Sequence, residues 1–63
     1  MMIPCFYRIL VGYTYDRYSG YVVGVGDERV CVCDAKSGKI RFFRGEDVTI
    51  DMEKYNKIKE FER

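Results

Sequence analysis

The sequence predicts a single small domain that is mostly β, with five short strands followed by one helix. Three observations predict this class. Sixty-three residues leave room for one domain, spanning residues 1–63. Short runs of β-branched and aromatic residues, which strands favour, are separated by glycine-containing turns. Residues 52–63 instead carry apolar side chains at helical spacing.

Composition limits the functions that the chain can serve. Lys and Arg number 11 against 10 Asp and Glu, so the net charge is +1. Such a balance argues against a general polyanion binder, because non-specific phosphate binding grows with the number of cations presented, but it leaves room for a local basic site. The chain has no histidine, the commonest general base. We therefore expect no enzyme activity, no catalytic residues, no metal site and no cofactor.

The three cysteines, Cys5, Cys31 and Cys33, leave one without an internal partner if two of them pair. The C-x-C spacing of Cys31 and Cys33 is not the spacing of zinc knuckles. Free thiols in a reducing compartment are the simplest interpretation, and a bridge from Cys5 to either of the others is the alternative. No secretory leader or membrane span is evident, so we expect a cytoplasmic protein that does not enter a membrane.

The elements are expected in the following order. The first strand covers residues 3–15, with a bend at Gly12, and a loop covers 16–20. Further strands follow at 21–25, 29–33, 39–44 and 48–50. Gly26 begins the turn of the middle hairpin, and Gly38 takes a positive φ in the turn of the next one. Asp51 then caps a helix over 52–63.

The two hairpin turns together predict which side chains share a face. The first register pairs Val23 with Val30, and the second pairs Val32 with Phe42. The expected core face therefore holds Tyr21, Val23, Val30, Val32, Ile40 and Phe42. The expected outer face carries an apolar patch of Val22, Cys31, Cys33 and Phe43, since side chains alternate along a strand. Either the helix or another molecule covers this patch, and we expect the helix.

Five short strands in meander order with a terminal helix resemble the SH3-like small β-barrels. The resemblance covers the whole chain at the level of architecture and hairpin spacing. It implies a single five-stranded SH3-like barrel with a short C-terminal helix. The group includes small archaeal chromatin proteins of similar length, which are lysine-rich, whereas this chain is nearly neutral. Fold alone does not transfer function.

One segment concentrates positive charge. Residues 35–44 hold four cations and no acid. Cations beside an aromatic ring can follow a phosphate backbone while the ring stacks on a base. The alternative is that these cations keep an edge strand from pairing with other chains. The residues expected to contact nucleic acid are Lys36, Lys39, Arg41, Phe43 and Arg44.

A second set of residues suits contact with a protein. Tyrosines gather around the first loop, and such rings combine a large contact area with a hydroxyl. The interface candidates are Val22, Cys31, Tyr15 and Tyr18. The expected function is therefore a non-catalytic binding module for nucleic acid, or alternatively a protein-interaction module, either as a monomer or as a homodimer.

Overall fold

A computed structural model describes residues 2–61 of the chain. It contains five antiparallel strands and one short C-terminal helix, so the mostly β class is confirmed. The strands are β1 (Ile3–Val11), β2 (Thr14–Val25), β3 (Arg29–Asp34), β4 (Ile40–Arg44) and β5 (Val48–Ile50). One turn of 3₁₀ helix, η1 (Gly45–Asp47), precedes β5, and helix α1 spans Met52–Phe61.

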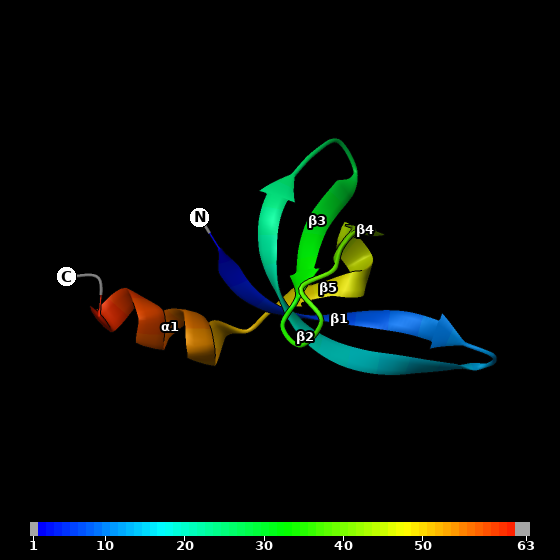
Figure 1. The fold of residues 1–63 in the computed structure, drawn as a ribbon, viewed down its shortest axis with the longest axis horizontal. Coiled ribbons are helices and arrows are strands. Elements are labelled where there is room, and N and C mark those ends of the chain that lie inside the picture. Colours follow the sequence, from blue (N-terminus) through cyan, green and yellow to red (C-terminus); the bar gives the residue numbers. More distant parts are fainter. Residues whose placement is uncertain (1, 62–63) are drawn as a thin grey trace.

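All five strands belong to one curved sheet in the order β4-β3-β2-β1-β5. The first four strands form a meander, and β5 returns to pair with the other edge of β1. The two edge strands, β4 and β5, do not pair with each other, so the sheet stays open (Figure 1). The expected five-stranded sheet is confirmed, but it does not close into a barrel, and its strong curvature leaves a concave side (Figure 1).

The expected first strand over residues 3–15 is wrong, because the chain reverses at Gly12 and Tyr13. Gly12 has a φ of 62°, the left-handed conformation that begins a tight two-residue turn. β1 then pairs with β2 along its whole length, from Val11 opposite Thr14 to Ile3 opposite Val22. The expected loop at 16–20 is consequently part of a long strand.

The register predicted for the hairpin of β2 and β3 is also wrong. Val30 lies opposite Val25 rather than Val23, because the turn is displaced, and a bulge between Val22 and Gly24 then shifts the rest of the pairing by one residue, so that Val22 lies opposite Val32. The turn lies one residue further along than expected. The N–H of Gly26 donates to the carbonyl of Arg29 over 2.9 Å, and Glu28 takes the left-handed φ of 61°.

The hairpin of β3 and β4 differs from its prediction by one residue. The N–H of Asp34 donates to the Lys39 carbonyl at 2.8 Å, which leaves a four-residue loop over 35–38. Val32 therefore lies opposite Arg41 instead of Phe42. The positive φ expected at Gly38 is confirmed at 74°.

These register changes exchange several residues between the two faces. The predicted core residues Ile40 and Phe42 are 61% and 68% exposed, and Val23 is exposed as well. Val32 is buried and Val30 half-buried as expected. The buried cluster is Cys5, Tyr7, Val22 and Val32, with Ile3, Ile9, Val30, Phe43 and Val48 packed against it. The expected outer patch is split, because Val22 and Phe43 belong to the core side whereas Cys31 and Cys33 do not.

Helix α1 begins as predicted, since the Asp51 carboxylate accepts a hydrogen bond from the Lys54 N–H at 3.1 Å. Residues 62–63, which were also expected to belong to the helix, lie outside the described residues. The helix extends away from the sheet on the side where β1 begins, near the N-terminus (Figure 1). Within the described part of the helix, the Lys54 ammonium links it to the sheet by donating to the Tyr21 hydroxyl at 2.8 Å. The expectation that the helix covers the outer patch is wrong, because the helix contacts mainly β1 rather than β3 and β4, which carry Cys31, Cys33 and Phe43.

The three cysteines are free thiols. Cys5 is buried on the concave side, whereas Cys31 and Cys33 project to the opposite face, as their strand positions require. No helix among residues 2–61 is long and apolar enough to cross a membrane. Within the same residues, no cluster of three or more His, Cys, Asp or Glu side chains has the geometry to hold a metal ion.

Candidate functional site

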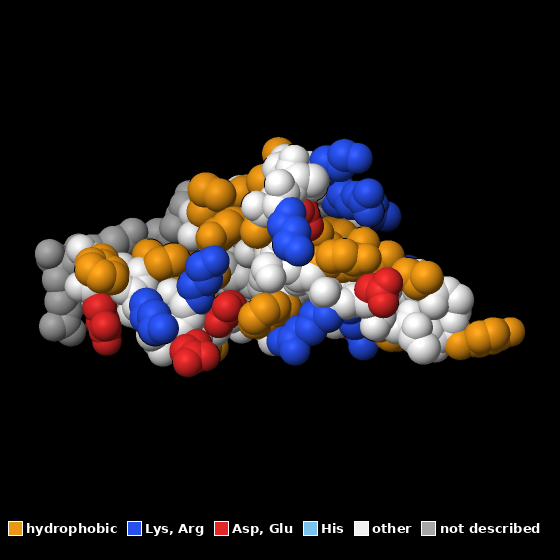
Figure 2. All heavy atoms as spheres, turned by 60° about the horizontal axis from the view of Figure 1, so that its bottom comes forward, with side chains coloured by type: hydrophobic (Ala, Val, Ile, Leu, Met, Phe, Trp, Pro, Cys, Tyr) orange, Lys and Arg blue, Asp and Glu red, His pale blue; other side chains and the backbone are white. Residues whose placement is uncertain are grey.

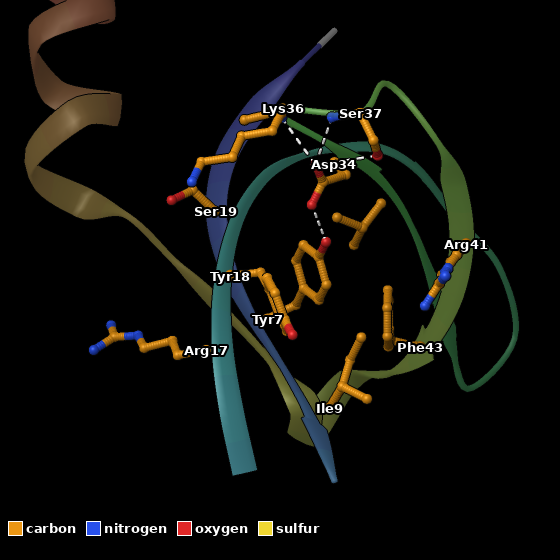
Figure 3. A pocket seen from close by; sticks show the side chains of 12 residues that line it. Tyr7, Ile9, Arg17, Tyr18, Ser19, Asp34, Lys36, Ser37, Arg41 and Phe43 are labelled. Atoms are coloured by element: carbon orange, nitrogen blue, oxygen red, sulfur yellow. Dashed lines mark hydrogen bonds between the residues drawn. The ribbon is translucent and has the colours of Figure 1, made fainter. Parts of the chain in front are cut away.

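The concave side of the sheet contains a hollow of about 490 Å³. Strands β1 to β4 and the loop between β3 and β4 supply its walls (Figure 3). This site brings together residues that are far apart in the sequence. Its lining residues are Tyr7, Ile9, Arg17, Tyr18, Ser19, Val32, Asp34, Ala35, Lys36, Ser37, Arg41 and Phe43.

Three aromatic rings form the apolar part of the hollow. Tyr7 lies in the centre and is only 5% exposed. The ring of Tyr18 stacks against it with centroids 5.5 Å apart, and the ring of Phe43 tilts against it at 4.7 Å. Tyr18 is 40% exposed and Phe43 is half-buried. Tyr7 thus acts as a buried spacer, and the two flanking rings are the ones that a ligand can reach.

The Tyr7 hydroxyl donates a hydrogen bond to Oδ2 of Asp34 (Figure 3). The other carboxylate oxygen accepts hydrogen bonds from the backbone N–H groups of Lys36 and Ser37, both at 2.8 Å. It also accepts one from the Ser37 hydroxyl at 3.2 Å. One carboxylate therefore holds both the central ring and the loop over 35–38 in place.

These contacts fix the protonation states. The hydrogen bond from Tyr7, followed by those from the Ser37 and Lys36 amides, lowers the pKa of Asp34 to about 2. Burial, with a smaller contribution from Asp34, raises the pKa of Tyr7 to about 12, although the Arg41 charge acts in the opposite direction. At neutral pH Asp34 is therefore ionised and Tyr7 is protonated, which matches the direction of their hydrogen bond.

Two cations lie at the margin of the hollow. Lys36 comes from the loop, and its side chain extends toward Ser19, whereas Arg41 comes from β4 on the other side (Figure 3). Arg17 also lines the hollow, but its guanidinium points away and lies over the Phe6 ring at 4.1 Å (Figure 3). Among the lining residues, Asp34 is the one acid, and most of its acceptor capacity is already used. The accessible groups are therefore two cations and two aromatic rings.

The structure brings together some of the residues predicted to contact nucleic acid and separates others. Lys36, Arg41 and Phe43 all line the hollow. Lys39 is exposed beside it and is not part of the lining. Arg44 projects to the opposite face, because it is one residue from Phe43 in the same strand, and its guanidinium lies 3.8 Å from the Glu46 carboxylate.

The predicted interface candidates also separate. Tyr18 forms a wall of the hollow, and Val22 is buried in the core. Cys31 is half-buried on the opposite face, where Phe42 is its neighbour in β4. Tyr15 lies under the Arg8 guanidinium at 4.2 Å, and Arg8 in turn forms an ion pair with Asp47 at 2.9 Å. This ion pair raises the pKa of Arg8. These four residues do not form one surface.

Sequence reasoning missed Tyr7 and Asp34, the two residues that organise the site. A signal for Tyr7 was present in the sequence, because every second residue of the first strand is apolar or aromatic, namely Ile3, Cys5, Tyr7 and Ile9, and the residues between them include Pro4 and Arg8. Period-2 alternation predicts one buried face, with Tyr7 in its centre. No comparable signal marked Asp34, since its partner lies on a distant strand.

Comparison of this chain with protein-family models, with curated proteins and with solved structures found no match. The function must therefore be inferred from the site itself.

Proposed function

We propose that this protein is a non-catalytic binding module that binds nucleic acid through the concave hollow. The contacting residues in this proposal are Lys36 and Arg41 for phosphate, and Tyr18 and Phe43 for a base. Lys39 adds long-range attraction from its position beside the hollow. We also infer that the open sheet is of the SH3-like kind, supported by a four-strand meander whose fifth strand returns beside the first. A cytoplasmic location fits the three free thiols.

The observation that carries the proposal is the presence of reachable rings and cations in one hollow. Aromatic rings stack on the faces of bases, and nearby cations neutralise the phosphate backbone. Asp34 does not weigh strongly against this, because its ionised oxygens already accept four hydrogen bonds from Tyr7, Lys36 and Ser37. The site is thus neither a bare acidic pocket nor a purely apolar one.

Charge reversal tests the proposal. Arg41→Glu should abolish binding of a labelled oligonucleotide, measured by fluorescence anisotropy at about 50 mM salt, where phosphate contacts are strong. Arg29→Glu is the matched control, because Arg29 is a cation of β3 on the other side of the sheet. Affinity of the unmodified protein should also fall as salt rises. If the unmodified protein binds no nucleic acid at this salt concentration, the proposal fails.

A second candidate function, contact with another protein or with a second copy of this chain, is favoured by the exposed apolar side chains. At the hairpin of β1 and β2, Leu10, Val11 and Tyr15 are more than half exposed and Tyr13 is fully exposed. Apolar side chains are spread along the face shown in Figure 2, out to the tip at its right end. Large exposed apolar patches are typical of interaction surfaces.

Salt and concentration separate this candidate from the first. An interface of this kind changes little with salt, whereas phosphate binding weakens steeply. Light scattering across a range of protein concentrations should show a dimer if a second copy is the partner. Leu10→Ser together with Tyr13→Ser should then return the protein to a monomer without loss of fold. A monomer at every concentration would argue against self-association.

A further inference from the structure

We propose that the hollow accepts an unpaired base from a single strand and discriminates against intact duplex. This inference rests on the proposed function and specifies the form of nucleic acid that it requires. The position of the rings, the position of the charges and the small number of cations support it.

The rings are recessed in the hollow and are not presented on a flat surface. Tyr18 and Phe43 flank the buried Tyr7 ring on the concave side of the curved sheet (Figure 3). The hollow, at about 490 Å³, is within the size range of cavities that hold small organic ligands. A base in a duplex has both faces covered by its neighbours, so only an unstacked base can enter such a site and contact these rings.

The charges favour one orientation of the nucleotide. Asp34 lies at the loop end of the hollow and stays ionised, because its hydrogen bonds hold its pKa at about 2. A phosphate placed inside the hollow against this carboxylate would be repelled, whereas an uncharged base would not be, and a phosphate outside the hollow would be attracted by the cations at its margin. Lys36 and Arg41 are at the margin, where they can contact phosphates outside the hollow (Figure 3). The base is therefore expected inside and the backbone across the margin.

The number of cations is too small for tight binding to a duplex surface. Affinity for duplex through the backbone alone grows with the number of phosphates neutralised. Here two cations lie at the margin of the hollow, and the guanidiniums of Arg17 and Arg8 lie over the rings of Phe6 and Tyr15 instead. Affinity then depends on stacking, which a duplex does not offer.

The test compares a single strand with its own duplex. A labelled mixed-sequence DNA strand of about 12 nucleotides and the same strand annealed to its complement are titrated at about 50 mM salt. The single strand should bind at least about tenfold more tightly. Phe43→Leu should weaken single-strand binding by about 5- to 150-fold, the range for loss of one stacked base, with less than about twofold effect on duplex.

Phe42→Leu is the matched control, because Phe42 is the same residue type one position away and faces the opposite side. It should leave both affinities unchanged. Phe43 also packs on Tyr7, so circular dichroism must show that its variant is folded. Should that variant unfold, Tyr18→Leu takes its place, since Tyr18 is the more exposed ring, and it should weaken single-strand binding in the same direction.

The possible outcomes distinguish a failure of the proposed function from a failure of this inference. No binding of either form overturns the proposed function together with this inference. Duplex binding as tight as single-strand binding overturns the inference and leaves the proposed function standing. The inference is also overturned, and the proposed function stands, if a folded Phe43→Leu or Tyr18→Leu variant binds the single strand as tightly as the unmodified protein does while Arg41→Gln weakens binding of both single strand and duplex.

Discussion

Tyr7 on β1 donates its hydroxyl hydrogen to the carboxylate of Asp34 at the end of β3, 27 residues later in the chain. The same carboxylate holds the backbone of the loop that carries Lys36. The ring at the centre of the hollow and the cation at its margin are therefore connected through one acidic side chain. Stability and ligand binding should respond together when this contact is removed.

Tyr7→Phe should lower the stability of the fold in a way that depends on pH. The folded pKa of Asp34, about 2, is below its ordinary value of 3.8, so its contribution is complete above pH 3.8 and is lost as the pH falls toward 2. The folded pKa of Tyr7, about 12, is above its ordinary value of 10.0, so its contribution is complete below pH 10 and is lost as the pH rises toward 12.

The measurement is the difference in thermal unfolding midpoint between the unmodified protein and Tyr7→Phe. This difference should be constant between about pH 4 and pH 10 and should shrink outside that window. Tyr15→Phe is the control and should show no such dependence, since Tyr15 is exposed. A constant difference from pH 2 to pH 12 would show that the hydrogen bond does not couple to folding.

Gly20→Ala should destabilise the fold by about 2 kcal/mol or more, because overpacking forces the backbone to move. A Cβ atom at Gly20 would lie 2.7 Å from the Cys33 carbonyl oxygen and 2.9 Å from a methyl of Val32. Gly24→Ala is the control in the same strand, where the nearest contact would be an ordinary 3.6 Å. Urea unfolding of both variants measures the two effects. Equal stability of the two would contradict the close approach of β2 and β3 at Gly20.

Gly38→Val should cost more than about 1 kcal/mol, because a β-branched residue is strongly disfavoured at positive φ. The φ of Gly38 is 74°, and no heavy atom lies within 4 Å of a Cβ built there, so the cost is conformational and not steric. Gly45→Val is the control, with open space and no positive φ. Similar unfolding free energies for the two variants would argue against the four-residue loop.

The number of strands and the cap of the helix could be predicted because each depends on local chemistry. Runs of valine and tyrosine favour strands wherever they occur, and Asp51 precedes the helix as a cap should. The reversal at Gly12 was missed because Tyr13 and Thr14 continue the β-forming run without a second turn residue. The total of five strands was therefore right for a partly wrong reason, since 3–15 was expected as one strand.

Registers were harder to predict than strands because small backbone irregularities decide them. The bulge after Val22 has no clear sequence signal, and it moves Val23 from the expected core to the outside. The loop over 35–38 is one residue longer than expected, and this moves Ile40 and Phe42 to the outside as well. The prediction that Arg41 and Phe43 act together does not depend on the exact register, because residues two apart in one strand share a face in any register. Lys36 joins them from the adjoining loop. Tyr7 joins them only through the curvature of the whole sheet.

The central claim is that nucleic acid binds in the concave hollow, and an NMR titration tests it most directly. A single-stranded DNA of about 12 nucleotides is added to ¹⁵N-labelled protein at about 50 mM salt. The account predicts that the largest amide shifts fall on Tyr18, Ser19, Lys36, Ser37, Arg41 and Phe43, while Cys31, Phe42 and Arg44 on the other face stay unchanged. Shifts concentrated on that other face, or no shifts at all, would contradict it.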